Sequence, residues 1–205
     1  MNPSPVLDSA AEPHAPAAPG EIADEVQLNR KLGFWLFLAS ELLIFCGLIG
    51  GFLVTKQYAA TWPTQEQLSI PLATVNTFLL LTSSLTVVLG LDGIRAGSSR
   101  RLAVFLVISA VLGALFLGGQ AVEYTHLIAG EGYGFGDPFG TAFFILTGLH
   151  GLHVLVGAVW ALAVAGRAAK GAYTPHNYTT ADMFGNYWHF VDLVWILIFT
   201  IVYLI

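Results

Sequence analysis

Five long apolar runs constrain this chain more than any other feature of its sequence. Each run comes close to, or exceeds, the roughly 20 residues that a helix needs to cross the hydrocarbon core of a bilayer. In lipid a single segment must satisfy its own backbone hydrogen bonds, so runs of this length span as helices. We therefore predict an all-α integral membrane bundle of five transmembrane helices, at about residues 32–54, 71–91, 102–122, 138–165 and 187–205.

The composition supports a membrane protein with one domain. Charged residues make up 10% of the 205 residues and hydrophobic residues 56%, whereas an ordinary soluble domain carries about 25% charged residues. No basic patch indicates a nucleic-acid partner. Residues 1–29 are rich in Pro, Ala and acids, and this composition predicts a disordered tail. The membrane domain is then expected to cover residues 30–205.

The basic residues are distributed unevenly between the two sides of the predicted membrane domain. If the N-terminus lies inside, seven of the eight Lys and Arg residues fall on the inner side, and only Lys56 falls on the outer side. Cytoplasmic loops carry such an excess of Lys and Arg in membrane proteins. The sequence therefore predicts that the N-terminus lies inside and the C-terminus outside.

Glu41 stands within the first apolar run, about nine residues from its start. At 1.5 Å per residue it lies roughly 14 Å deep, where a charged side chain costs a few kcal/mol or more. One interpretation is a protonated carboxyl group that joins two helices by a hydrogen bond. The other is a carboxyl group beside a proton route, since acids within membranes are functional candidates.

Two further pairs of polar residues lie inside predicted spans. His150 and His153 are three residues apart, as are His189 and Asp192, so each pair shares one face of its helix. One histidine pair supplies two ligands, whereas a closed zinc site needs four. We therefore expect hydrogen bonding between helices, with no metal and no catalytic set in this chain. Asp192, His153 and Glu41 come out at comparable depths and would form one polar cluster if their helices adjoin.

A third group of polar residues lies at the predicted outer end of the third span. Glu123 and His126 are close enough to the surface for water to reach them, and Gln120 lies one turn before them. A structural or interface role is the default expectation for residues in this position.

Five motifs, in order along the chain, resemble subunit III of the haem-copper terminal oxidases. They are "LASELLIF" from Leu38, "NTFLLLTSSLTV" from Asn76, "GQAVEY" ending at Tyr124, "GYGFGDPFGTAFFILTGLHGLHVLVGAVW" and "NYWHFVDLVWILIFTIVYLI". The resemblance covers about residues 30–205. It places Glu41 at the position of the carbodiimide-reactive glutamate of that family.

The resemblance implies a function exercised within a complex. Such a complex reduces O₂ to water and pumps protons in the bacterial plasma membrane. The family's subunit III binds no redox centre; the haems and copper belong to partner subunits. The implied roles of this chain are to stabilise subunit I, to bind phospholipid and to support proton uptake, with subunit II also in the complex. The motif "WHFVD" then implies packing between helices and between subunits.

One departure and two alternatives accompany this resemblance. The long form of the family has seven spans, so its first two helices have no counterpart in this chain; in some bacterial oxidases extra helices of subunit I fill that gap. The first alternative is the related accessory subunit of nitric oxide reductases. The second is a standalone transporter that uses Glu41 and the histidines, although the sequence lacks the paired broken helices and inverted halves typical of transporters. The electron donor, cytochrome c or quinol, stays open.

Overall fold

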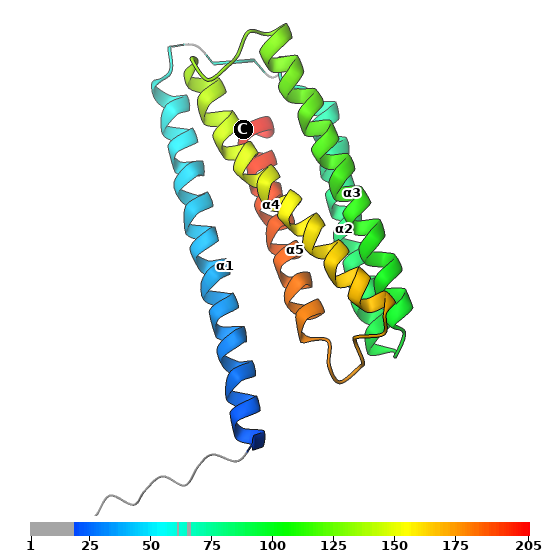
Figure 1. The fold of residues 1–205 in the computed structure, drawn as a ribbon. Coiled ribbons are helices and arrows are strands. Elements are labelled where there is room, and N and C mark those ends of the chain that lie inside the picture. The colour runs from blue at the N-terminus through cyan, green and yellow to red at the C-terminus, as the bar shows by residue number, and fades with distance from the viewer. Residues whose placement is uncertain (1–18, 61, 65–66) are drawn as a thin grey trace, which may run out of the picture.

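The computed structural model describes residues 19–60, 62–64 and 67–205. All regular structure in these residues is helical: α1 (Pro19–Tyr58), α2 (Ile70–Arg95), α3 (Ser99–Thr125), α4 (Pro138–Ala169) and α5 (Thr179–Phe199), with the π-helical turns η1 (His126–Gly130) and η2 (Thr200–Leu204) extending α3 and α5. Five helices are long and apolar enough to cross a membrane (Figure 1). The predicted all-α architecture with five spans is therefore confirmed.

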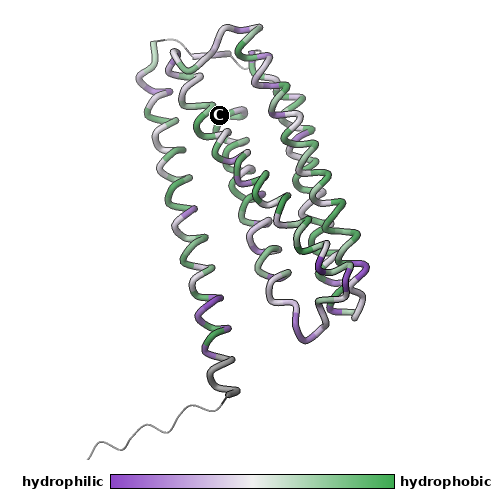
Figure 2. Tube along the Cα trace, in the orientation of Figure 1, coloured by the Kyte–Doolittle hydropathy of each residue, from purple (hydrophilic) through white to green (hydrophobic). Residues whose placement is uncertain are grey.

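Four of the helices form a ring, and the fifth lies outside it. Helices α2, α3, α4 and α5 each pack against two others of this set, and α1 packs on α4 and α5 (Figure 1). We call the end of the bundle with the α2–α3 and α4–α5 loops the proximal end. The opposite end, with the α1–α2 and α3–α4 loops and the C-terminus, is the distal end. Hydrophobic residues cover the central length of the helices, and hydrophilic residues gather towards the ends (Figure 2).

Local sequence signals explain where α3 and α4 begin. The Ser98 side chain accepts a hydrogen bond from the Arg101 backbone N–H, and Asp137 accepts one from the Gly140 N–H. These caps satisfy backbone donors that have no partner within the helix. Pro138 follows Asp137 at the first helical position, where its missing N–H costs nothing.

All five helices extend beyond the predicted spans, and α1 and α5 do so the furthest, at their N-terminal ends. Helix α1 begins at Pro19, so residues 19–29, which composition placed in a disordered tail, are helical; residues 1–18 lie outside the described part. Once the apolar span has nucleated a helix, adding further residues costs little. Helix α5 begins at Thr179, two turns before the predicted start at residue 187. Its first turns are polar, and hydropathy alone does not detect them.

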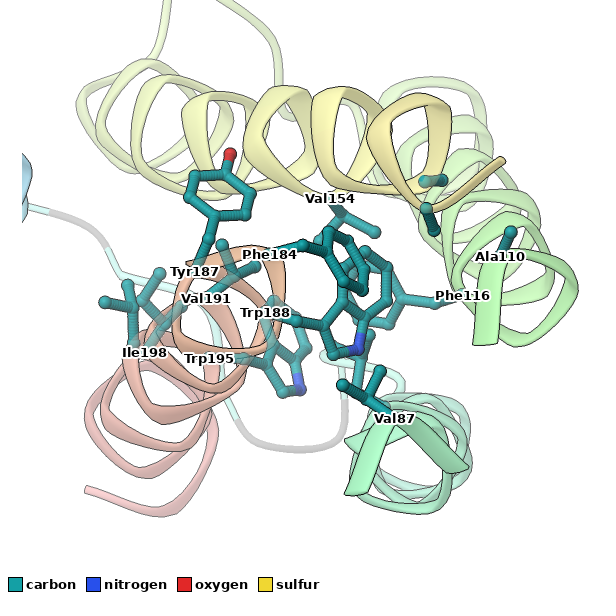
Figure 3. Packing of buried hydrophobic residues seen from close by; sticks show 14 of the residues in the cluster. Val87, Ala110, Phe116, Val154, Phe184, Tyr187, Trp188, Val191, Trp195 and Ile198 are labelled. Carbon is teal, nitrogen blue, oxygen red and sulfur yellow. The ribbon is translucent and has the colours of Figure 1, made fainter. Parts of the chain in front are cut away.

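Two tryptophans of α5 occupy the interior of the ring (Figure 3). Trp188 and Trp195 are fully buried. The Trp188 Nε1–H donates to Ser83 Oγ at 2.9 Å, and the Trp195 Nε1–H donates to Thr77 Oγ1 at 2.9 Å. Both acceptors lie on α2, so the two indoles join α5 to α2 by hydrogen bonds as well as by packing. This arrangement provides the polar partner that a buried indole N–H requires.

Two glycines make room for the Trp188 ring. A Cβ atom added at Gly113 would lie 2.9 Å from the ring, and one added at Gly157 would lie 2.7 Å from it. Both distances are shorter than a van der Waals contact between carbon atoms. The indole therefore packs directly against the backbones of α3 and α4, and this close approach sets the spacing of the ring.

Candidate functional site

Glu41 of α1 and His153 of α4 form a direct pair inside the membrane-spanning region. The Glu41 Oε2 atom lies 3.0 Å from His153 Nε2. The two side chains are only 16% and 12% exposed, and the Phe45 ring packs edge-on against the imidazole, with 5.1 Å between centroids. The pair joins the peripheral helix α1 to the ring of the other four.

The second nitrogen of His153 determines how this pair shares its proton. His153 Nδ1 lies 2.8 Å from the Leu149 carbonyl oxygen, which is an acceptor only, so Nδ1 carries a proton. The neutral imidazole then presents a lone pair at Nε2, and the bond to Glu41 requires one further proton between them. If the proton lies on Glu41, the pair is a neutral carboxylic acid with a neutral imidazole. If it lies on His153, the pair is a carboxylate with an imidazolium. Both forms are neutral overall, which lowers the cost of burying them in lipid.

His150 lies one turn from His153 on the same helix, among three aromatic rings. It is fully buried, and neither of its ring nitrogens has a hydrogen-bond partner among the described residues. Its ring stacks on Trp195 with 5.0 Å between centroids, and Phe116 packs edge-on against it at 5.7 Å. The His150 imidazole therefore packs as one ring of an aromatic cluster.

His189 and Asp192 of α5 do not contact the Glu41–His153 pair; His189 contacts α2 and also lines a groove beside α1. His189 Nδ1 lies 2.6 Å from Ser84 Oγ. Asp192 is 4% exposed and lies beside the same Ser84 hydroxyl, although the distance or angle does not meet the criterion for a hydrogen bond. The five polar residues expected within the spans therefore divide into separate groups: Glu41 pairs with His153, His189 pairs with Ser84, and no hydrogen bond connects the two pairs.

Gln120 belongs to a hydrogen-bonded network between α3 and α4. Its Nε2 donates to the Thr147 carbonyl oxygen at 2.7 Å and to Tyr124 Oη at 2.9 Å. The Thr147 hydroxyl donates to the Phe143 carbonyl oxygen, so the Tyr124 hydroxyl donates to Thr147 Oγ1 across 2.8 Å. Every donor in this network has an acceptor, as buried polar groups require.

Glu123 and His126 differ in their surroundings, although they lie within one turn of each other. Glu123 is 1% exposed and accepts a hydrogen bond from the Tyr203 hydroxyl at 2.8 Å. His126 opens the η1 turn and is exposed. We expected both residues to lie within reach of water, and for Glu123 this expectation is wrong because the C-terminal turn η2 covers it.

The proximal end carries a small charged group outside the apolar core. Arg95 lies 3.7 Å from Asp182, and its Nε–H donates to Tyr178 Oη at 3.4 Å. Arg167, in the last turn of α4, lies over the ring of Tyr173 in the α4–α5 loop. Burial raises the pKa of the Tyr173 hydroxyl above its ordinary value, and the nearby Arg167 charge opposes this effect. These contacts fix the loop that leads into α5.

The described residues do not bring together three or more His, Cys, Asp or Glu side chains in one place. The polar residues of the spans instead form pairs between helices. The sequence could not identify which residues the polar side chains of the spans would bond to. Ser84, Thr147 and Tyr203 were missed because hydroxyl side chains are common in apolar runs and do not by themselves indicate a contact. The double serine at positions 83 and 84 was the one available indication, since both hydroxyls bond to α5.

Comparisons with known proteins agree with the motifs. The family of cytochrome c oxidase subunit III matches residues 15–205. The chain is 39% identical over 178 residues to cytochrome c oxidase subunit 3 of Alkalihalophilus pseudofirmus, covering 86% of each chain. It is 38% identical to cytochrome c oxidase subunit 3 of Bacillus subtilis, with 92% of each covered. It is 36% identical to quinol oxidase subunit 3 of Bacillus spizizenii, with 91% of this chain and 92% of the relative covered. The chain therefore belongs to the cytochrome c oxidase subunit III family.

Proposed function

We propose that this chain is the non-redox subunit III of a proton-pumping haem-copper terminal oxidase in the bacterial plasma membrane. Its relatives are subunits of cytochrome c and quinol oxidases. In this proposal the haems and copper lie in partner subunits. The chain stabilises subunit I, contacts subunit II and membrane phospholipid, and supports proton uptake.

The Glu41–His153 pair is the observation that carries this proposal. Two titratable groups share one proton between α1 and α4, at the position where the family resemblance places a reactive glutamate. The pair joins α1 to α4 within the spans, and it therefore supports a role of this chain in holding a membrane complex together.

The orientation in this proposal follows from charge. The proximal end would face the cytoplasm, because seven of the eight basic residues lie towards it: two in the first third of α1, four at the proximal ends of α2, α3 and α4, and Lys170 in the α4–α5 loop. Lys56, near the end of α1, is the one basic residue at the distal end. Such an excess of Lys and Arg marks the cytoplasmic side.

Purification through an affinity tag on this chain tests the proposal. We expect a haem-containing subunit I and a copper-containing subunit II to co-purify, as identified by mass spectrometry, and the optical spectrum to show haem. Oxygen consumption with reduced cytochrome c and with quinol, measured side by side, would identify the electron donor. Isolation of the chain alone from intact membranes, with no haem protein attached under mild detergent, would refute the assignment.

A further inference from the structure

A polar pocket lies at the proximal end of the seam between α1 and α5. Its volume is about 170 Å³, and it is lined by Lys31 of α1, by Asp182 in the first turn of α5, and by His176, Tyr178 and Thr179 beside them. Lys31 directly precedes the first apolar run of the sequence. The pocket therefore lies at the level of the membrane surface, where the lipid headgroups are.

An apolar groove lies on the same two helices, further towards the middle of the membrane. Its volume is about 460 Å³, and its lining includes Trp35, Leu38 and Leu42 of α1 and Asn186, Phe190 and Leu193 of α5. Trp35 is one turn from Lys31, and Asn186 is one turn from Asp182, so the pocket and the groove share the same faces of α1 and α5. The seam is therefore polar at the membrane surface and apolar below it.

The contacts around the pocket leave Lys31 available to an anion. Asp182 already has a cationic neighbour, because Arg95 of α2 lies 3.7 Å from it. Among the described residues Lys31 has no ion-pair partner. The Tyr178 hydroxyl accepts a hydrogen bond from Arg95, so its own proton is free to be donated. One ammonium group and one O–H donor in the same pocket are suited to a phosphate group, which accepts strong hydrogen bonds from both.

One polar side chain in the groove lies at the depth of the ester groups of a lipid. Asn186 follows Asp182 by four residues, and at 1.5 Å per residue it lies about 6 Å further into the membrane. Its amide group both donates and accepts hydrogen bonds, and leaving such a group unpaired in hydrocarbon is costly. In a phospholipid the ester carbonyl groups lie between the phosphate and the acyl chains. They would therefore meet Asn186, with an acyl chain along the apolar part of the groove.

We propose that the seam between α1 and α5 binds one phospholipid, with its phosphate at Lys31 and one acyl chain in the groove. A helix of another subunit is a poorer occupant. Helices α1 and α5 already contact each other, and a third helix, about 10 Å across, would lie over the groove without filling the pocket at Lys31. The inference rests on the proposed function, in which the chain contacts membrane phospholipid, and it adds the site and the group that is recognised.

Photo-crosslinking of the purified complex tests this site. The complex is held in micelles of an uncharged detergent, and the probe is phosphatidylglycerol with a photoreactive diazirine in one acyl chain. Diacylglycerol with the same diazirine is the comparison, because it has the chains and the esters but no phosphate. We expect peptide mass spectrometry to find the label on the residues of α1 and α5 that line the groove. The yield should be about fivefold lower with diacylglycerol, which is the effect of one basic residue at an anionic lipid surface.

Two pairs of variants separate the phosphate contact from the chain contact. Lys31→Gln should lower the groove labelling by phosphatidylglycerol about fivefold. Arg30→Gln removes the same charge from the neighbouring residue, which does not line the pocket, and this matched control should leave the labelling unchanged. Ala39 lines the groove, so Ala39→Phe should fill it and abolish the labelling there. Ser40→Phe, next to it but outside the lining, is the control and should not.

Three results would overturn the site. Equal labelling of the groove by the two probes, or unchanged labelling in Lys31→Gln and Ala39→Phe, would show that lipid only surrounds the helices. A groove without label in an intact complex would show that another subunit covers it. All three leave the proposed function in place, since that depends on co-purification of the haem subunit. If Lys31→Gln fails to assemble, the comparison of the two probes on the wild type still decides.

Discussion

Substitution of Glu41 gives the most direct test of how α1 is attached to the other helices. Glu41→Ala removes the partner of His153 Nε2, and that nitrogen is then buried beside Phe45 without a donor. An unpaired buried polar group costs about 1–3 kcal/mol, whereas hydrogen bonds between membrane helices average about 0.6 kcal/mol and reach about 1.7 kcal/mol. We therefore expect a loss of about 1–2 kcal/mol, which multiplies the fraction of detached α1 by roughly 5–30.

Glu41→Gln should have a much smaller effect. The Gln amide can donate an N–H to the lone pair at His153 Nε2, since Nδ1 already carries the proton that bonds Leu149. The hydrogen bond is kept, and only the shared proton is lost. We expect near-normal haem content and continued O₂ reduction, with any deficit confined to proton pumping.

The assay compares steady-state O₂ consumption, proton pumping, the haem spectrum and retention of the subunit in the purified complex. Ser40→Ala is a matched control, because Ser40 is the exposed neighbour of Glu41 and bonds only within its own helix, to the Phe37 carbonyl oxygen. A double-mutant cycle with His153→Ala should give a coupling energy of about 0.5–2 kcal/mol. Complete loss of turnover in Glu41→Gln, with haems intact and the subunit still bound, would show that Glu41 is catalytic and would refute the supporting role.

Three further predictions follow from the topology and the packing. Cysteines placed singly at Gly130 and Ser98, in a background without the native cysteine, should react differently with an impermeant reagent added outside: position 130 labels and position 98 does not, and the reverse result would refute the orientation. The purified chain, separated from its partners, should contain neither haem nor copper by optical and metal analysis; a stoichiometric cofactor would contradict this. Gly157→Ala should lower the thermal stability of the complex, by about 1–3 kcal/mol for an overpacked core, because its Cβ would meet the Trp188 ring. Gly47→Ala, where a Cβ meets open space, is the control and should leave the melting temperature unchanged.

The hydropathy of the sequence located the five helices but not their full lengths. The predicted span at 138–165 and helix α4 begin at the same residue, Pro138, because the Asp-Pro cap coincides with the edge of the apolar run. Helix α5 begins at Thr179, since its first turns are polar and lie beyond the apolar run. Hydropathy identifies the part of a helix that lies in the hydrocarbon core of the membrane. Where the helix begins and ends beyond that part is decided by capping residues and by helix propagation.

The partners of the polar residues depend on which helices are neighbours, and a single sequence does not contain that information. Glu41 and His153 were both identified as unusual, yet their pairing requires α1 to lie on α4. Asp192 could have joined them if their helices adjoined, but it is buried beside Ser84 of α2. Depth along a helix is readable from residue counts, whereas the direction in which a side chain points around the bundle is set by packing.

The peripheral place of α1 has a consequence for the order of biosynthesis. Helix α1 is made first, but both helices on which it packs, α4 and α5, are made last. Glu41 and His153 are 112 residues apart, so at about 5–20 residues per second the ribosome needs roughly 6–20 s to supply the partner. During that interval α1 lies in the membrane without the histidine partner of its acid, which makes its insertion more costly. Helix α1 must then diffuse within the membrane until it meets α4 and α5. Until that contact forms, only the α2–α3 hairpin connects α1 to them.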